Sequence, residues 1–180
     1  SSILDFQTAD FDPGNDLPYI LFLPTYAATA FYHGKVRTRK SLPSFLKDVE
    51  RFASGEYTLA LAKGDTLSQK ERSHIAEELA RFTGLSEEYI LRTNLRIEIF
   101  RFTKELLRER NRSVGRLDTR FTGIDRDSAG ENFEFDPSMA AIIGPYTATL
   151  YDYIRSELNF ESDLPYEVLN PKVWPWSYAQ

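Results

Sequence analysis

The sequence "NDLPYILFLPTYAATAFYHGK" (residues 15–35) combines a high density of apolar and aromatic side chains with almost no charge. Its Asp-x-Pro start, Asp16 to Pro18, is typical of the beginning of a helix. We therefore predict a helix from Leu17 to Lys35. A helix with so little polar surface must bury much of its length against other elements, so the stretch indicates a helical fold assembled around it.

This stretch does not predict a membrane span. Its longest apolar run, Ile20 to Pro24, is far shorter than the about 20 residues that cross a bilayer. The chain opens with "SSILDFQTADF" and shows no basic segment followed by an apolar one, so no secretory signal is predicted. The abrupt apolar start, without an initiator methionine, leads us to expect a piece of a longer protein.

Helix signals dominate the rest of the chain. Ser68 and Glu71 form a capping box before residues 69–83, and Asp136-Pro137 is a favourable helix start. We expect Gly55, Gly64 and Gly84 to end helices, and Gly144-Pro145 to kink or break one. The predicted helices are 42–54 (capped by Ser41), 56–63, 69–83, 86–95, 98–110 and 138–160. Residues 113–123 are expected to be extended and 124–135 to form a polar loop, which gives a mainly α fold with one domain over residues 1–180.

Composition excludes several classes of protein. The 180 residues are 42% hydrophobic, enough for a core, and a net charge of -5 argues against a nucleic-acid binder. The absence of cysteine excludes disulfides, thiolate metal sites and a cysteine nucleophile. We predict no cofactor.

No catalytic motif is recognisable. A G-x-S-x-G nucleophile elbow is absent, and the chain has only two histidines, His33 and His74. His33 is a weak candidate for a general base, and a capping or packing role is the better interpretation. His74 lies among charges on the predicted 69–83 helix, which indicates a solvated position.

Acidic residues between 125 and 136 allow two further interpretations. Asp125, Asp127 and Gly130 match the first, third and sixth positions of a calcium loop, but Ala129 and Asp136 replace the ligands expected at the fifth and last positions. We predict no metal site. A hydrolase using Asp125 and Asp127 as paired carboxylates would need raised pKa values.

Positive charge is concentrated in residues 92–120, where nine Lys/Arg face four acids. The simplest interpretation is a solvated helix face. The alternative is a site for carboxylates or an acidic partner, because a guanidinium binds a carboxylate with two hydrogen bonds. Arg116 and Arg120, in "GRLDTRFTG" (115–123), are the best candidates for such a site.

Three long stretches carry a resemblance to a known family. They are "SSILDFQTADFDPGNDLPYILFLPTYAATAFYHGK" (1–35), "NLRIEIFRFTKELLRERNRSVGRLDTRFTG" (94–123) and "FDPSMAAIIGPYTATLYDYIRSELNFESDLPYEVLN" (135–170). In this order they resemble the middle of bacterial serine carboxypeptidase-related proteins, peptidase family S10 of the α/β-hydrolase fold. The resemblance covers nearly the whole chain, although none of its motifs is catalytic.

The resemblance implies that this chain is the helical cap inserted into a hydrolase core. Residues 1–12 would continue a core strand and residues 165–180 would return to the core. The catalytic triad would lie outside the chain, which alone would be inactive. Its partners would be the rest of the hydrolase and a peptide substrate, and the compartment stays undetermined. The residues expected to line the substrate cleft are Tyr19, Tyr26, Phe31, Tyr32, His33, Arg116 and Arg120.

Two other expectations follow. Without its core, the chain would expose apolar surface and self-associate. The alternative to a cap is a free-standing helical interaction module whose basic segment, residues 92–120, binds an acidic partner.

Overall fold

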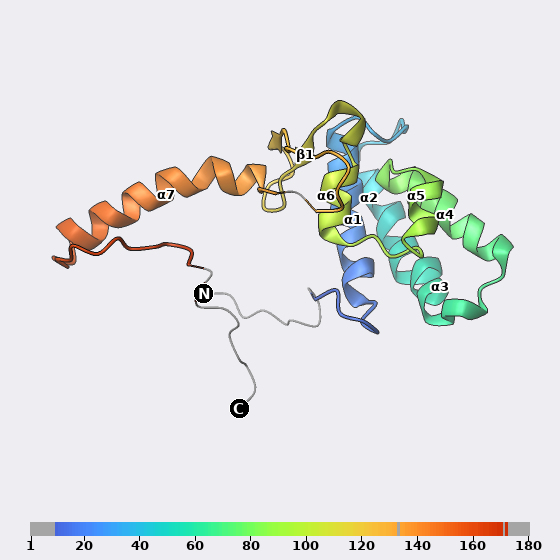
Figure 1. Cartoon of the computed structure of the whole chain (residues 1–180). Coiled ribbons are helices and arrows are strands. Elements are labelled where there is room, and N and C mark those ends of the chain that lie inside the picture. Colours follow the sequence, from blue (N-terminus) through green and yellow to red (C-terminus); the bar gives the residue numbers. More distant parts are fainter. Residues whose placement is uncertain (1–9, 133, 171, 173–180) are drawn as a thin grey trace. The chain divides into compact units, whose positions relative to one another are not determined.

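The computed structural model describes residues 10–132, 134–170 and 172. The described chain is mainly helical (Figure 1), which confirms the predicted fold class. Its longer elements are the helices α1 (Leu17–Tyr32), α2 (Leu42–Phe52), α3 (Thr58–Lys63), α4 (Gln69–Thr83), α5 (Glu87–Arg92), α6 (Ile99–Glu105) and α7 (Pro137–Ser156), and the strands β1 (Ser113–Val114) and β2 (Thr122–Gly123).

The chain divides into two compact units, whereas the sequence analysis expected one domain over residues 1–180, which stays a prediction. The N-terminal unit ends at Ser138, and the C-terminal unit begins at Met139 and holds most of α7. Residues 10–12 are not a strand, and the predicted core strand over residues 1–9 lies outside the described residues. Residues 165–170 consist of bends and irregular backbone, and most of 171–180 also lies outside the description. No helix among the described residues is long and apolar enough to cross a membrane.

Local sequence signals place most helix starts to within one residue, whereas the helices predicted at 86–95, 98–110 and 138–160 end three to five residues early, at Arg92, Glu105 and Ser156. The Ser68 hydroxyl accepts a hydrogen bond from the Glu71 backbone N–H, and the Glu71 carboxylate accepts one from the Ser68 N–H at 2.9 Å, which completes the capping box. Gly84 ends α4 in the left-handed conformation, with a φ of 70°. The first helix ends at Tyr32, three residues before the predicted Lys35. The extended segment predicted at 113–123 is a hairpin in which β1 and β2 pair antiparallel.

Two predicted helix breaks are wrong. The chain passes through Gly55 in a π-helical segment, Ala53–Tyr57, that joins α2 to α3. Phe52 and Tyr57 are five residues apart and stack with ring centroids 5.9 Å apart, so the wider π turn keeps both aromatic rings in the core. Helix α7 likewise is not broken at Gly144-Pro145, where a kink or a break was predicted. Both residues are exposed, so water can hydrate the carbonyl that the Pro145 ring nitrogen cannot bind.

Helix α1 is the centre of the hydrophobic core. It packs against α2 and α4 (Figure 1), and it buries Leu23, Tyr26, Ala27 and Ala30, which recur at helical spacing. The Tyr26 ring stacks on Phe102 of α6 with centroids 4.1 Å apart. The apolar stretch that opens the sequence analysis therefore packs against three helices of its own unit.

Two buried tyrosines, Tyr26 and Tyr57, differ in whether their hydroxyl group has a hydrogen-bond partner. The Tyr57 hydroxyl donates to the Leu95 carbonyl oxygen at 2.6 Å, whereas the Tyr26 hydroxyl has no hydrogen-bond partner among the described residues. Because an unpaired buried hydroxyl costs free energy, Tyr26→Phe is expected to raise the free energy of unfolding by about 1 kcal/mol. Tyr57→Phe is expected to lower it by about the same amount. Urea denaturation of the two variants checks this, and shifts of the same sign would contradict it.

Candidate functional site

A surface groove lies between α1 and the loop that joins β1 to β2. Its volume is about 390 Å³. One wall is a face of α1, and the other is the β1–β2 loop. The lining residues are Thr25, Ala28, Thr29, Tyr32, Leu42, Arg116, Leu117, Asp118, Thr119 and Arg120.

The β1–β2 loop is held together by backbone hydrogen bonds and leaves no room for a side chain at Gly115. The Gly115 N–H donates to the Phe121 carbonyl at 2.9 Å, and the Phe121 N–H donates to the Asp118 carbonyl at 3.2 Å. A Cβ atom on Gly115 would lie 2.6 Å from the Asp118 carbonyl oxygen and from the Ser138 Cβ atom. Glycine is therefore required at position 115, because any side chain would push the loop away from its support.

The start of α7 anchors the same loop. Asp136 Oδ1 accepts hydrogen bonds from the Arg116 N–H at 3.1 Å and from the Ser138 N–H at 2.8 Å. The Ser138 hydroxyl accepts a hydrogen bond from the Leu117 N–H at 3.0 Å. Ser138 is buried, with only 2% of its surface exposed. The Asp136-Pro137 helix start predicted from the sequence thus also fixes the backbone of Arg116 and Leu117.

Thr29 of α1 and His33, the residue that follows α1, contact the opposite side of the loop at Thr119. The Thr29 and Thr119 hydroxyl oxygens are 2.9 Å apart, and His33 Nε2 lies 2.7 Å from the Thr119 carbonyl oxygen. Because a carbonyl can only accept, Nε2 must carry the proton and donate it. This contact fixes the His33 ring against the loop.

The two groove arginines are in different electrostatic environments. The Arg120 guanidinium donates to both carboxylate oxygens of Asp118, at 2.6 to 3.2 Å. Those bonds, together with one from the Arg120 N–H, lower the pKa of Asp118 to about 2. Arg116 Nε is 3.8 Å from Asp136 Oδ2, which is too long for a hydrogen bond.

The structure separates the residues that were predicted to share a cleft. Tyr32, Arg116 and Arg120 line the groove, and His33 supports its loop. Tyr26, by contrast, is a core residue with 3% of its surface exposed. The two remaining aromatic residues are partly buried elsewhere, Phe31 against Phe45 and Tyr19 against Phe11.

Sequence reasoning missed the threonines and Asp118. Thr25, Ala28, Thr29 and Tyr32 follow the i, i+3, i+4, i+7 spacing of one helix face. This stripe of small and hydroxyl-bearing residues in an otherwise apolar helix is the signal that could have located the α1 wall.

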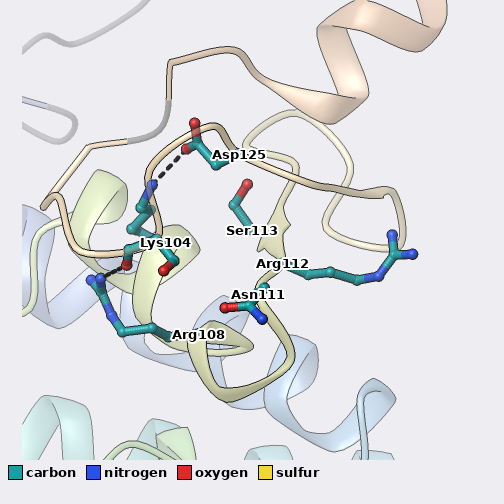
Figure 2. Close-up of a pocket in the computed structure, with 7 residues that line it drawn as sticks. Lys104, Arg108, Asn111, Arg112, Ser113 and Asp125 are labelled. Atoms are coloured by element: carbon teal, nitrogen blue, oxygen red, sulfur yellow. Dashed lines mark hydrogen bonds and ion pairs between the residues drawn. The ribbon is translucent and has the colours of Figure 1, made fainter.

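A second polar cluster lies between α6 and the 124–130 loop (Figure 2). Lys104 Nζ donates to Asp125 Oδ2 at 2.6 Å, and the two side chains are only 3% and 4% exposed. The adjoining cavity, about 10 Å³, has room for one water molecule at most. This cluster is therefore too small to bind an organic ligand.

The position of Lys104 argues against both the calcium site and the paired-carboxylate hydrolase. Its ammonium group occupies the position beside Asp125 that the calcium pattern would give to a cation, and the described residues contain no group of three or more His, Asp and Glu arranged for a metal. Burial raises the pKa of Asp125, but hydrogen bonds from Lys104 and from the Glu134 N–H together lower it by more than burial raises it. The pKa of Asp125 is therefore below its ordinary value. A general acid at neutral pH requires the opposite shift.

The basic segment is largely neutralised within the N-terminal unit. Among the described residues, every lysine and arginine between 92 and 120 except Arg112 lies within 4.0 Å of a carboxylate oxygen. Arg108 additionally donates to the Ser128 and Gly130 carbonyls. These cations mainly hold the unit together, which weakens the case for a continuous basic surface.

Comparisons with protein-family models, with curated proteins and with solved structures find no match to this chain.

Proposed function

We propose that the N-terminal unit is a cap that forms one wall of a peptide-binding site in a serine carboxypeptidase-like hydrolase. The catalytic serine, acid and histidine would lie outside this chain. The resemblance of the three stretches motivates the proposal, and one observation carries it. Tyr32, Arg116 and Arg120, which the resemblance selects from distant parts of the sequence, line the same groove.

The chemistry of the groove suits binding rather than bond cleavage. It offers an aromatic ring, an aliphatic side chain, hydroxyl groups and guanidinium groups, which together can bind a peptide's side chains and polar termini. His33, the histidine nearest to it, already donates its Nε2 proton to Thr119.

In the proposed mechanism the cap positions the substrate for a reaction that the core performs. The core serine attacks the scissile carbonyl, the C-terminal amino acid leaves, and water hydrolyses the resulting ester. The cap contributes by holding the peptide in a reactive orientation and by limiting access to the site. Tyr32, with 61% of its surface exposed at the groove, is the side chain most available to an apolar residue of the substrate.

The test uses the complete protein encoded by the source gene. We expect the flanking sequence to supply a serine elbow before this segment and an aspartate and a histidine after it. The complete protein should release the C-terminal residue of N-blocked dipeptides, whereas residues 1–180 alone should not.

Tyr32→Ala in that protein is expected to raise KM for dipeptides with large apolar residues about tenfold, since a buried aromatic contact contributes roughly 1.5 kcal/mol. Leu59→Ala is the control, because Leu59 is a similarly exposed apolar residue, 65%, outside the groove. Flanks without a serine nucleophile, or equal KM values for Tyr32→Ala and the parent, would contradict the proposal.

A further inference from the structure

We propose that α7 joins two copies of the chain as an antiparallel helix pair, through an apolar stripe formed by Ile143, Tyr146, Leu150 and Tyr153. We call these four residues the α7 stripe. The proposal rests on the C-terminal unit alone and does not depend on the proposed function. It assigns a specific surface to the self-association that is expected from the sequence.

The α7 stripe has the spacing of a helix that packs on another helix. Its successive members are three, four and three positions apart, which is the pattern of the apolar seam in helix pairs. None of the four is fully buried, and Tyr146 and Tyr153 are 64% and 50% exposed. An exposed apolar face with this spacing indicates a site for a partner helix.

The rest of the C-terminal unit covers a different side of α7. Residues 158–166 turn back along the helix (Figure 1), and the Tyr166 ring meets the Tyr151 ring edge-on with centroids 6.3 Å apart. The Tyr151 hydroxyl also donates to the Tyr166 carbonyl oxygen. Tyr151 and Arg155, which line the hollow beneath this segment, lie more than about 100° around the helix axis from the middle of the α7 stripe. The segment therefore packs on a side of α7 that the stripe does not occupy.

The sequence of α7 is symmetric about Ala148, and this symmetry identifies a second copy as the partner. In "IIGPYTATLYDYI" (142–154), four pairs of residues are equidistant from Ala148: Ile142 and Ile154, Ile143 and Tyr153, Tyr146 and Leu150, and Thr147 and Thr149. A two-fold axis at the level of Ala148, perpendicular to the helix, would place each member of a pair opposite the other member in the second copy. The α7 stripe is thus complementary to itself in an antiparallel arrangement.

Side-chain size also favours the antiparallel arrangement. It sets Tyr153 opposite Ile143 and Tyr146 opposite Leu150, so each aromatic ring meets an aliphatic side chain. A parallel pair would instead set each tyrosine against its own counterpart.

Charge does not oppose the approach of two copies. Residues 137–151 contain no charged side chain, so no like charges meet along this length of the helix. In the antiparallel pair the N-terminal end of each helix lies beside the C-terminal end of the other, which is the favourable arrangement of the two helix dipoles.

The first experiment measures the sedimentation of the 180-residue chain by analytical ultracentrifugation. We expect a monomer–dimer equilibrium between about 1 and about 300 µM, because an interface of one helix per copy is small and therefore weak. Leu150→Glu should raise the dissociation constant at least about tenfold, since it places an unpaired charge in the seam. Ala148→Glu is the matched control. It adds the same charge at an exposed position on the opposite side of α7, and it should leave the dissociation constant unchanged.

The second experiment measures the orientation of the two helices. The sequence has no cysteine, so a single introduced cysteine can be labelled specifically. Ala141 and Arg155 are exposed and equidistant from Ala148. In the antiparallel pair, a label on Ala141→Cys of one copy lies beside a label on Arg155→Cys of the other, whereas two labels at position 141 are about 20 Å apart along the helix axis. Förster energy transfer should therefore be greater between positions 141 and 155 than between two labels at 141.

Several results would overturn the proposal. One is a monomer at every concentration, including a monomer that Leu150→Glu destabilises, because the α7 stripe would then be covered within the chain. Another is a dimer that Leu150→Glu and Ala148→Glu affect equally, since its interface would lie elsewhere. A third is energy transfer that is not greater for the 141–155 combination. Circular dichroism verifies that each variant keeps its helix content. None of these measurements needs the hydrolase core, so the inference can fail while the cap function stands.

Discussion

Asp125→Ala is expected to lower the free energy of unfolding of the N-terminal unit by about 3–5 kcal/mol, the usual result of removing one partner from a buried ion pair. The Lys104 ammonium is 3% exposed and would stay in the interior without its carboxylate. Asp125 also accepts the Glu134 N–H at 3.2 Å, so the variant loses this hydrogen bond as well. Urea denaturation of the full chain measures the change.

Two controls separate the ion pair from the loop. Asp127→Ala removes an exposed carboxylate two residues away but keeps the Asp127 carbonyl, to which Lys104 also donates, and should cost less than about 1 kcal/mol. The double variant Lys104→Met/Asp125→Leu removes both charges and should recover most of the loss, because apolar replacements for a buried pair are often neutral. A double variant as unstable as Asp125→Ala would contradict the ion-pair explanation.

The same pair gives the protein a defined response to acid. The pKa of Asp125 is below its ordinary value in the folded state, so its stabilising contribution is complete above the unfolded pKa of about 3.9. That contribution is lost as the pH falls through the lower, folded pKa. The difference in stability between the parent chain and Asp125→Ala should therefore shrink at low pH.

The parts of the fold that depend on near neighbours in the sequence were predictable. The Ser68–Glu71 capping box and the Asp136-Pro137 helix start need only residues within one turn, and both appear in the structure. The passage of the chain through Gly55 depends instead on burying Phe52 and Tyr57 together, which is a tertiary effect that overrides the preference of glycine for helix ends.

The candidate site shows the same division. Arg116 and Arg120 could be selected from their sequence context, but only the structure distinguishes them, since Asp118 binds one and not the other. Tyr26 and Tyr32 could not be separated because α1 is apolar on several sides, so the sequence did not reveal which side faces the core. The Lys104–Asp125 pair was likewise hidden among 22 basic and 27 acidic residues.

Gly84→Ala is expected to destabilise the N-terminal unit by about 2–5 kcal/mol, through a left-handed backbone that alanine resists and through a collision. Gly84 has a φ of 70°, and an added Cβ would lie 2.7 Å from the Lys35 Cβ and 2.8 Å from the Lys35 carbonyl oxygen. The Lys35 backbone cannot easily retreat, because its N–H donates to the Ala30 carbonyl at 2.8 Å and holds the end of α1.

Gly34→Ala is the matched control. Gly34 has nearly the same φ, 67°, but nothing lies within 4 Å of an added Cβ. It should therefore lose only the backbone term, about 1 kcal/mol. The difference between the two variants in urea denaturation measures the contact between the ends of α1 and α4, and equal losses would show that no such contact constrains Gly84. A large difference would mean that the end of α1, which carries His33 and so supports the groove loop, is held in place by the packing of α4.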